Sequence, residues 1–179
     1  MKRIALAFGI LGTMAMVACG PNRNKEIQQI EQAEASLLGN VASVVMDTTL
    51  GAQTIDLYLQ FAKDFPNDSL TPEYLYRAAD IAFNMGNEQK ALDCFNQIID
   101  NHETYRNLGN CYFMLGECYS ALGQYQEAKE AYGEFVKLFP DHPLAKDTRY
   151  QLEHNMIGLS PEEMLKAVIE NAALAEEIQ

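Results

Sequence analysis

The sequence has 179 residues, enough for one domain, and carries 13 Lys and Arg against 25 Asp and Glu, for a formal net charge of −12. This acidity excludes nucleic-acid binding by phosphate neutralisation, which needs basic surfaces, and disfavours attraction to anionic lipid headgroups. Any attachment to a membrane must therefore use something other than a basic patch.

The first residues are typical of a secretory signal. Lys2 and Arg3 precede the uncharged stretch Ile4–Val17, and small residues flank Cys19. A membrane-spanning helix needs roughly 20 apolar residues, so this stretch is too short to span. The pattern predicts a cleaved signal peptide, whose loss removes two positive charges and leaves a formal charge of −14. An uncleaved hydrophobic N-terminus is the alternative.

The sequence Met-Val-Ala-Cys at Met16–Cys19 resembles the lipobox of bacterial lipoproteins, with Met where that family usually has Leu. The resemblance implies that residues 1–18 are a lipoprotein signal peptide, that Cys19 is acylated, and that residues 19–25 form a lipidated tether. Several acyl chains anchor stably, whereas a single chain holds only marginally. Gly20, rather than Asp, follows the Cys, which in such lipoproteins favours the outer membrane. We therefore expect a bacterial cell-envelope protein on the periplasmic face of that membrane.

Residues 26–179 are predicted to form one helical domain that begins with a partial repeat at 35–66. A first helix over 26–46, a turn at 47–51 and a second helix over 52–65 are expected. The second helix and its end carry an aromatic and proline spacing that recurs further along the chain: Tyr58-x2-Phe61-x4-Pro66 matches Tyr132-x2-Phe135-x4-Pro140. The first helix offers small and large side chains for the contact between the two: Leu38, Ala42 and Val45.

The first helix also carries an apolar seam with heptad-like spacing, interrupted by Glu34. The members of this seam are Ile27, Ile30, Leu37, Val41 and Val44. We favour docking of the seam against the next hairpin, because it spans fewer than three heptads. The other interpretation is self-association, which would make the protein a homo-oligomer.

Two clearer repeats follow, at 72–103 and 109–142. The first is marked by Leu75-x2-Ala78-Ala79-x2-Ala82-x3-Gly86-Asn87 and then Ala91-x3-Phe95-x2-Ile98. The second reads Tyr112-x2-Leu115-Gly116-x2-Tyr119-x3-Gly123-x-Tyr125-x2-Ala128-x3-Tyr132-x2-Phe135-x4-Pro140. Small residues such as Gly116 and Ala128 let two antiparallel helices approach, Gly123 frees the backbone for a tight turn, and Pro140 ends the second helix.

The C-terminal part is predicted to form a helix over 144–154, a break at Gly158 and a last helix over 161–178. Ser160, Pro161 and Glu163 form a capping box with Pro at the first helical position. The apolar residues of this last helix fall on one stripe: Leu165, Val168, Ile169, Ala172 and Ala175. We expect the stripe to cover the open end of the helical stack.

The repeat pattern resembles the tetratricopeptide repeat, a 34-residue helical hairpin, with Tyr112 in place of the usual Trp. The resemblance implies an all-α fold, an α-solenoid of about four antiparallel helical hairpins with a C-terminal capping helix. Gly86 and Gly123 are 37 residues apart. The surplus over 34 is predicted to lengthen the turn, or to add a helical turn, near residues 100–106.

In tetratricopeptide arrays the first helix of each hairpin lines a concave, partner-binding face. Carried over by register, the outward residues are Tyr76, Asp80, Phe83 and Asn84 in one repeat, and Asn110, Phe113, Glu117 and Ser120 in the next. The Lys and Asn clamp by which some arrays grip a terminal carboxylate is absent. Aromatic and acidic side chains suit an apolar or aromatic segment that carries Lys or Arg. Equally, the aromatic residues could pack against neighbouring helices and the acids could be solvated.

The sequence gives no indication of catalysis, of a metal site or of a cofactor. His102, His142 and His154 have no metal-ligand spacing with other His, Cys or carboxylate residues, and no phosphate loop or nucleophile motif is present. Cys94 and Cys111 lie on successive helices and could form a disulfide in an exported protein. We favour free buried thiols for these residues and for Cys118.

Together these patterns predict a lipid-anchored envelope adaptor that binds a protein partner, with no enzymatic activity. Over residues 52–152 it broadly resembles the repeat lipoproteins of the outer-membrane β-barrel assembly machinery and the repeat domain of the periplasmic coordinator of the Tol-Pal system. A self-associating structural protein of the envelope is the alternative. An enzyme with an unrecognised site comes last, because no residue argues for it.

Overall fold

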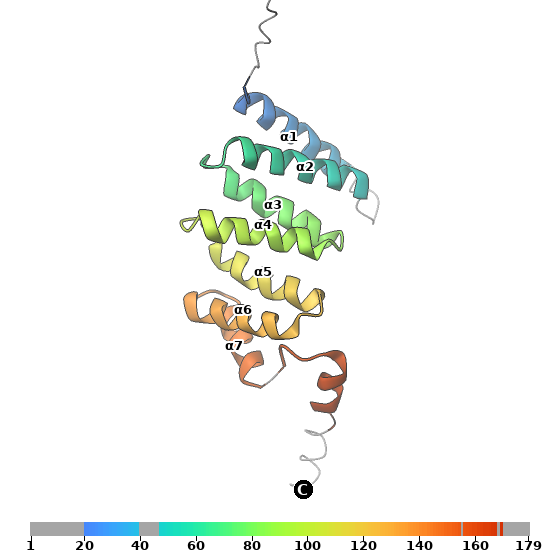
Figure 1. Ribbon diagram of the computed structural model, residues 1–179, viewed down its shortest axis with the longest axis vertical. Helices are drawn as coiled ribbons and strands as arrows, with labels where there is room; N and C mark the ends of the chain where they lie inside the picture. Colours follow the sequence, from blue (N-terminus) through green and yellow to red (C-terminus); the bar gives the residue numbers. More distant parts are fainter. Residues whose placement is uncertain (1–19, 40–46, 155, 168, 170–179) are drawn as a thin grey trace, which may run out of the picture.

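The computed structural model describes residues 20–39, 47–154, 156–167 and 169. In these residues the chain is all helical, which confirms the predicted α-solenoid (Figure 1). The numbered helices are α1 (Arg23–Gly39), α2 (Thr48–Asp64), α3 (Thr71–Asn84), α4 (Glu88–Asn101), α5 (Leu108–Ala121), α6 (Tyr125–Leu138) and α7 (Ala145–Glu153). A further helical stretch covers 161–167. No helix of the described part is long and apolar enough to cross a membrane.

The helices follow a strict period of 37 residues. α3, α5 and α7 begin at Thr71, Leu108 and Ala145. α2, α4 and α6 end at Asp64, Asn101 and Leu138. The linkers 65–70, 102–107 and 139–144 between successive hairpins are therefore of equal length. The three residues in excess of a 34-residue repeat are therefore present in every repeat, and the linker near residues 100–106 is no longer than the other two.

Each linker repeats the same pair of turn hydrogen bonds. The carbonyl of its first residue accepts from the N–H of its fourth, and the carbonyl of the fourth accepts from the first residue of the next helix. In chain order these bonds are Asp68 to Phe65 (3.0 Å), Thr71 to Asp68 (3.0 Å), Tyr105 to His102 (2.9 Å), Leu108 to Tyr105 (3.0 Å), His142 to Phe139 (3.1 Å) and Ala145 to His142 (2.8 Å). The linker at 102–107 has no proline equivalent to Pro66 or Pro140 of the other two linkers, and it adopts the same conformation.

Two helix starts differ from the prediction because side chains cap the helices earlier. α1 begins at Arg23, inside the predicted tether, where the side-chain oxygen of Asn22 accepts from the N–H of Lys25 (3.1 Å). α2 begins at Thr48, so that most of the predicted turn at 47–51 is helical. The Asp47 carboxylate accepts from the N–H groups of the second and third residues of α2, at 2.9 and 3.2 Å.

The N-terminal helix uses a different apolar side from the one expected for a hairpin partner. Ile30 is 1% exposed, and Ile27 and Leu37 pack against the same core. Leu38, by contrast, is 71% exposed, while Ala42, Val45 and the seam residues Val41 and Val44 lie outside the described residues. The described part of the seam is therefore used for docking within the chain, in agreement with the favoured interpretation.

The hairpins α3–α4 and α5–α6 pack closely through small residues. Ala78, Ala79 and Ala82 of α3 are fully buried, and so are the larger Leu75 and Ile98 around them. At Gly116 of α5 an added Cβ would lie 2.5–2.7 Å from ring carbons of Tyr132 on α6. The tight turns contain Gly86 and Gly123, whose φ angles of 73° and 74° favour glycine. The predicted roles of these glycines are confirmed.

The C-terminal end differs from the expected cap. The capping box is present: the Ser160 N–H donates to Glu163 Oε2 (2.8 Å) and the Glu163 N–H donates to Ser160 Oγ (3.3 Å). However, Leu165 and Ile169 of the predicted stripe are 62% and 60% exposed. The side chain of Val168 is not described, and Ala172 and Ala175 lie outside the described residues. The described stripe does not cover the end of the stack.

We expect Gly116→Ala to lower the free energy of unfolding by about 1–3 kcal/mol, the usual cost of overpacking, because its Cβ would overlap the Tyr132 ring. Gly133→Ala is the matched control on α6, where nothing lies within 4 Å of the new Cβ. It should stabilise by about 0.5–1 kcal/mol through helix propensity alone. Urea unfolding followed by circular dichroism compares the two. Stabilisation by both variants would show that α5 and α6 are not in this close contact.

Candidate functional site

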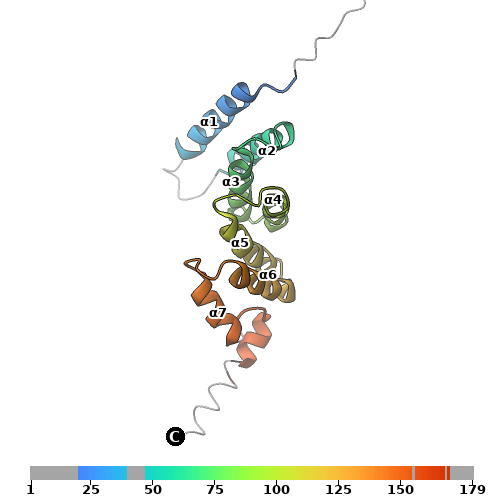
Figure 2. The same cartoon turned by 90° about the vertical axis from the view of Figure 1, so that its left-hand side faces the viewer.

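The first helices of the hairpins share one side of the bowed stack. Figure 2 shows α1, α3 and α7 on its left-hand, hollow side, with α4 at the bulge opposite. The period of 37 residues places Tyr76 and Phe113 at the same position of α3 and α5, and Asp80 and Glu117 at another. This side is the face to which the candidate binding residues were assigned.

The aromatic side chains on this face are half-buried, because their rings pack against neighbouring residues. The Tyr76 ring packs edge-on against Phe95, with centroids 5.7 Å apart. Phe113 packs in the same way against Tyr132, at 5.5 Å. Phe83 is also half-buried and contacts the core. Packing against neighbouring helices, one of the two interpretations from the sequence, is therefore present, and each ring keeps a partly exposed edge.

The two acidic candidates, Glu117 and Asp80, differ in whether their carboxylates are hydrogen-bonded. Glu117 accepts a hydrogen bond from the Tyr132 hydroxyl, and burial together with this bond raises the pKa of Tyr132. Asp80 is exposed, and its backbone carbonyl accepts from the Asn84 side-chain amide at 2.8 Å. One oxygen of Glu117 is thus already engaged, whereas the Asp80 carboxylate faces solvent.

Three of the candidate residues meet in a cavity of about 400 Å³ between α5, α6, α7 and the segment after α7. They are Phe113, Glu117 and Ser120. The other lining residues are Tyr125, Tyr132, Leu144, Asp147, Thr148, Gln151, Met156, Ile157, Gly158, Leu159 and Met164. Asn110 lines a separate cleft of about 220 Å³ beside the linkers 102–107 and 139–144. The four candidates on α3 line neither, so the structure does not gather the set into one site.

The cavity exists because the repeat pattern fails at α7. One repeat earlier, Met114 and Tyr119 of α5 pack against the core. The residues at the equivalent positions, 37 further on, are Gln151 and Met156. Gln151 is polar, and Met156 lies beyond the end of α7 and is 54% exposed. Space that side chains fill between α3, α4 and α5 is therefore left open one repeat later.

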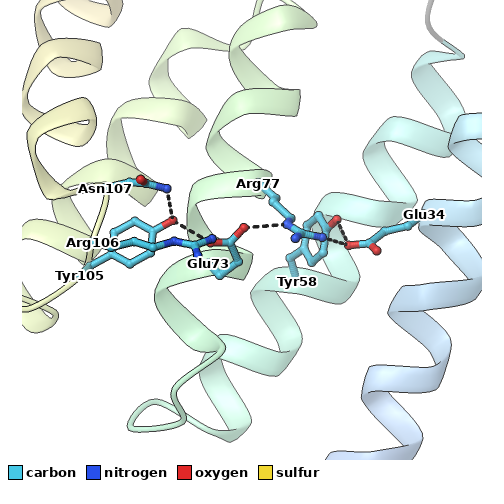
Figure 3. Close-up of polar contacts among 7 residues, drawn as sticks. All are labelled: Glu34, Tyr58, Glu73, Arg77, Tyr105, Arg106 and Asn107. Atoms are coloured by element: carbon cyan, nitrogen blue, oxygen red, sulfur yellow. Dashed lines mark hydrogen bonds and ion pairs between the residues drawn. The ribbon is translucent and has the colours of Figure 1, made fainter. Parts of the chain in front are cut away.

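A second polar feature, which the site prediction missed, crosses the same side nearer the N-terminus (Figure 3). Glu34 of α1 accepts from the Tyr58 hydroxyl (2.6 Å) and from Arg77 Nη1 (2.7 Å). Arg77 Nε also donates to Glu73, one turn earlier on α3, at 3.1 Å. The network thus joins α1, α2 and α3. Its sequence indications were the acidic interruption of the seam at Glu34 and the four-residue spacing of Glu73 and Arg77.

The network continues into the linker between α4 and α5. The Tyr105 hydroxyl and Arg106 Nη2 both donate to Glu73 Oε2, at 3.0 and 3.1 Å, and the Asn107 amide donates to the Tyr105 hydroxyl at 3.3 Å. Burial acts to raise the pKa of Glu73. The hydrogen bonds from Tyr105 and Arg77 and the nearby positive charges outweigh it and lower that pKa. Glu73 is therefore held as an ionised acceptor by three donors.

The cysteines of the core are free and buried, so the possible Cys94–Cys111 bridge is not formed. Burial raises the pKa of Cys94 to about 11 and that of Cys111 and Cys118 to about 12. Such thiols are poor nucleophiles at neutral pH. In the part of the chain that the structure describes, no group of three or more His, Cys, Asp or Glu is placed to hold a metal ion.

Comparison with known proteins agrees with this geometry. Residues 70–152 match the tetratricopeptide repeat family. A search of curated proteins found no match. The part of the chain from α3 to α7 is therefore similar to an array of tetratricopeptide repeats. Arrays of this family serve as binding surfaces for other proteins and are typically not catalytic.

Replacing Arg77 by Ala should weaken the docking of α1 and the linker on α3. The change leaves Glu34 and Glu73 without their shared cation, and we expect a loss of about 1–2 kcal/mol at pH 7, modest because the Arg77 side chain is 45% exposed. Because the folded-state pKa of Glu73 is lowered, its contribution is present above the ordinary value of about 4.3 and disappears as the pH falls through the folded-state pKa.

The difference in unfolding free energy between the unaltered protein and Arg77→Ala should consequently shrink between pH 7 and pH 3. Arg149→Ala removes an exposed arginine that has no ion-pair partner in the described part of the chain, and serves as the control. A pH-independent difference for Arg77→Ala would mean that the side chain acts by packing alone.

Proposed function

We propose that this protein is a lipid-anchored adaptor of the bacterial cell envelope that binds a protein partner through the hollow side of its repeats. The repeat array from α3 to α7 supports the binding role. The proposal of an anchor rests on the sequence Met16–Cys19, which resembles a lipobox and lies outside the described residues. The residue after Cys19 favours the periplasmic face of the outer membrane.

The observation that carries the binding proposal is the cavity between α5, α6 and α7. Its walls combine the apolar surfaces of Phe113 and Tyr125 with the carboxylate of Asp147. Asp147 is exposed, stands in the first turn of α7 and has no ion-pair partner among the described residues. Desolvated aromatic surface supplies binding energy and a free charge supplies selectivity. The cavity thus suits an apolar or aromatic side chain that has Lys or Arg beside it.

A partner segment that extends beyond the cavity would run onto α3 along the same side. It would pass the candidate residues of the preceding repeat: Tyr76, Asp80, Phe83 and Asn84. Asp80 and Asn84 are exposed there, and Tyr76 and Phe83 offer partly exposed ring surface. Asn110 is in reach of a segment that turns towards the linkers. We propose this extended path as the remainder of the binding face.

The alternative of an envelope protein that self-associates through its N-terminal helix gains no support. The described seam residues Ile27, Ile30 and Leu37 are already packed against the chain's own core. The three core thiols do not support the enzymatic alternative, because they are buried and their pKa values are raised.

A photo-crosslinking amino acid at Ser120, inside the cavity, should yield a discrete adduct with a partner protein in cells. Asp147→Lys reverses the exposed charge without touching the core and should reduce that adduct about tenfold, which corresponds to about 1.4 kcal/mol. The same crosslinker at Glu130, an exposed position of α6 that does not line the cavity, is the control. An adduct from Ser120 that is unaffected by Asp147→Lys, or no adduct at all, would contradict the proposed site.

Cys19→Ala should move the protein from the membrane fraction to the soluble fraction, because the acidic chain has no basic patch to hold it to lipid. Cys94→Ala removes a buried thiol instead and should leave the protein with the membranes. Cell fractionation with immunoblotting distinguishes the two. Retention of Cys19→Ala at the membrane would rule out the lipid anchor.

A further inference from the structure

The cavity on the hollow side is partly closed by the chain itself. Residues 156–164 follow α7 and contribute Met156, Ile157, Leu159 and Met164 to its lining. These side chains lie around the same space as Phe113 and Ser120 of α5. The segment therefore forms one wall of the cavity and limits the space that is open to a partner segment.

A close backbone contact seats this segment on α6. Gly158 has φ +80°, and an added Cβ there would lie 2.8 Å from Lys129 Cβ and 3.0 Å from the carbonyl oxygen of Tyr125. The ends of the segment are also defined: the Met156 N–H donates to the Gln151 carbonyl at 2.8 Å, and Ser160 caps the following helix. The backbone conformation at Gly158 thus decides where the segment lies.

The register explains why the chain turns here and does not complete a regular hairpin. Leu165 and Ile169 stand 37 residues after Ala128 and Tyr132, both of which are buried in α6. Yet Leu165 and Ile169 are mostly exposed. On α7, Arg149 occupies the position that Tyr112 has on α5, and Glu153 occupies that of Gly116.

Charged side chains on α7 cannot receive an apolar second helix without loss of hydration. Among the described residues after α7, Leu165 and Ile169 are consequently not buried as those of a regular second helix would be. In the described residues, no hydrogen bond joins 156–164 to α5 or α6, and Met156 and Met164 remain 54% and 47% exposed. The segment is held at the edge of the cavity by apolar contact and by the fit of Gly158 against α6.

We propose that residues 156–164 are an autoinhibitory segment, which walls the partner site and restricts access to it until a partner displaces the segment. The inference rests on the function proposed above. Because the segment is covalently attached, its effective concentration at the cavity is high, and weak contacts suffice to keep a competing peptide out. The Met, Ile and Leu side chains of the segment also indicate the chemistry that the cavity accepts.

A labelled peptide with the sequence of residues 156–167 tests this proposal on the full-length protein in detergent. Gly158→Ala should unseat the native segment, and fluorescence anisotropy should then show peptide binding at least about tenfold tighter than to the unaltered protein. Gly123→Ala is the matched control, because Gly123 has nearly the same φ, 74°, with nothing within 4 Å. It introduces the same backbone strain without the clash and should bind like the unaltered protein.

Two further variants locate the effect. Ile157→Ser weakens the apolar contact without backbone strain and should also admit the peptide, so a folding defect of Gly158→Ala does not decide the result. Gln151→Trp, which fills the cavity from α7, should abolish binding when combined with either variant. Binding of the peptide to the unaltered protein as tightly as to the opened variants would overturn the proposal, as would no binding to either opened variant. The Ser120 crosslink is measured separately, so its loss, and not these results, would overturn the proposed function.

Discussion

Two consecutive turn hydrogen bonds in each linker set the 37-residue period on which the rest of the molecule depends. They place Thr71, Leu108 and Ala145 at equivalent starts, and so bring α3, α5 and α7 to the same side of the stack. Because the period is constant, side chains at one helical position meet the same kind of neighbour in each repeat. The edge-on pairs of Tyr76 with Phe95 and of Phe113 with Tyr132 are an example. The face assigned to binding is a product of this regularity.

The candidate site, however, lies where the regularity ends. Up to α6 the hairpins bury small and large apolar residues against each other. At α7 the same positions carry Arg149, Gln151 and Glu153. Polar substitution at one end of a repeat array thus creates both the open space and the loosely held segment that lies in it. At the N-terminal end, the apolar seam of α1 is short, and the charged network around Arg77 adds to the attachment of α1 to the array.

The features that could be predicted from the sequence are those fixed by local chemistry. Gly116, Gly123 and the Ser160–Glu163 box behave as their residue types require. What could not be predicted depends on packing between distant segments. Two apolar sides compete on α1, and only the fold decides that Ile30 is buried and Leu38 is not. The exposure of Leu165 and Ile169 likewise depends on charged residues of another helix. The predicted groove residues lie on α3 and α5, and only Phe113, Glu117 and Ser120 of them line the cavity, a division that residue periodicity does not reveal.

The three buried thiols have a consequence for how a chain of this sequence would mature in an oxidising compartment. In the unfolded state, thiols of ordinary pKa are about 3% ionised at pH 7, and oxidising conditions would pair them at random. Once Cys94, Cys111 and Cys118 are enclosed, burial raises their pKa values and leaves a much smaller fraction of each thiol ionised at pH 7. Correct maturation then requires that the chain folds before its thiols are oxidised. Contacts between neighbouring hairpins are close in sequence and form quickly, so a fold built from them favours early burial of the thiols.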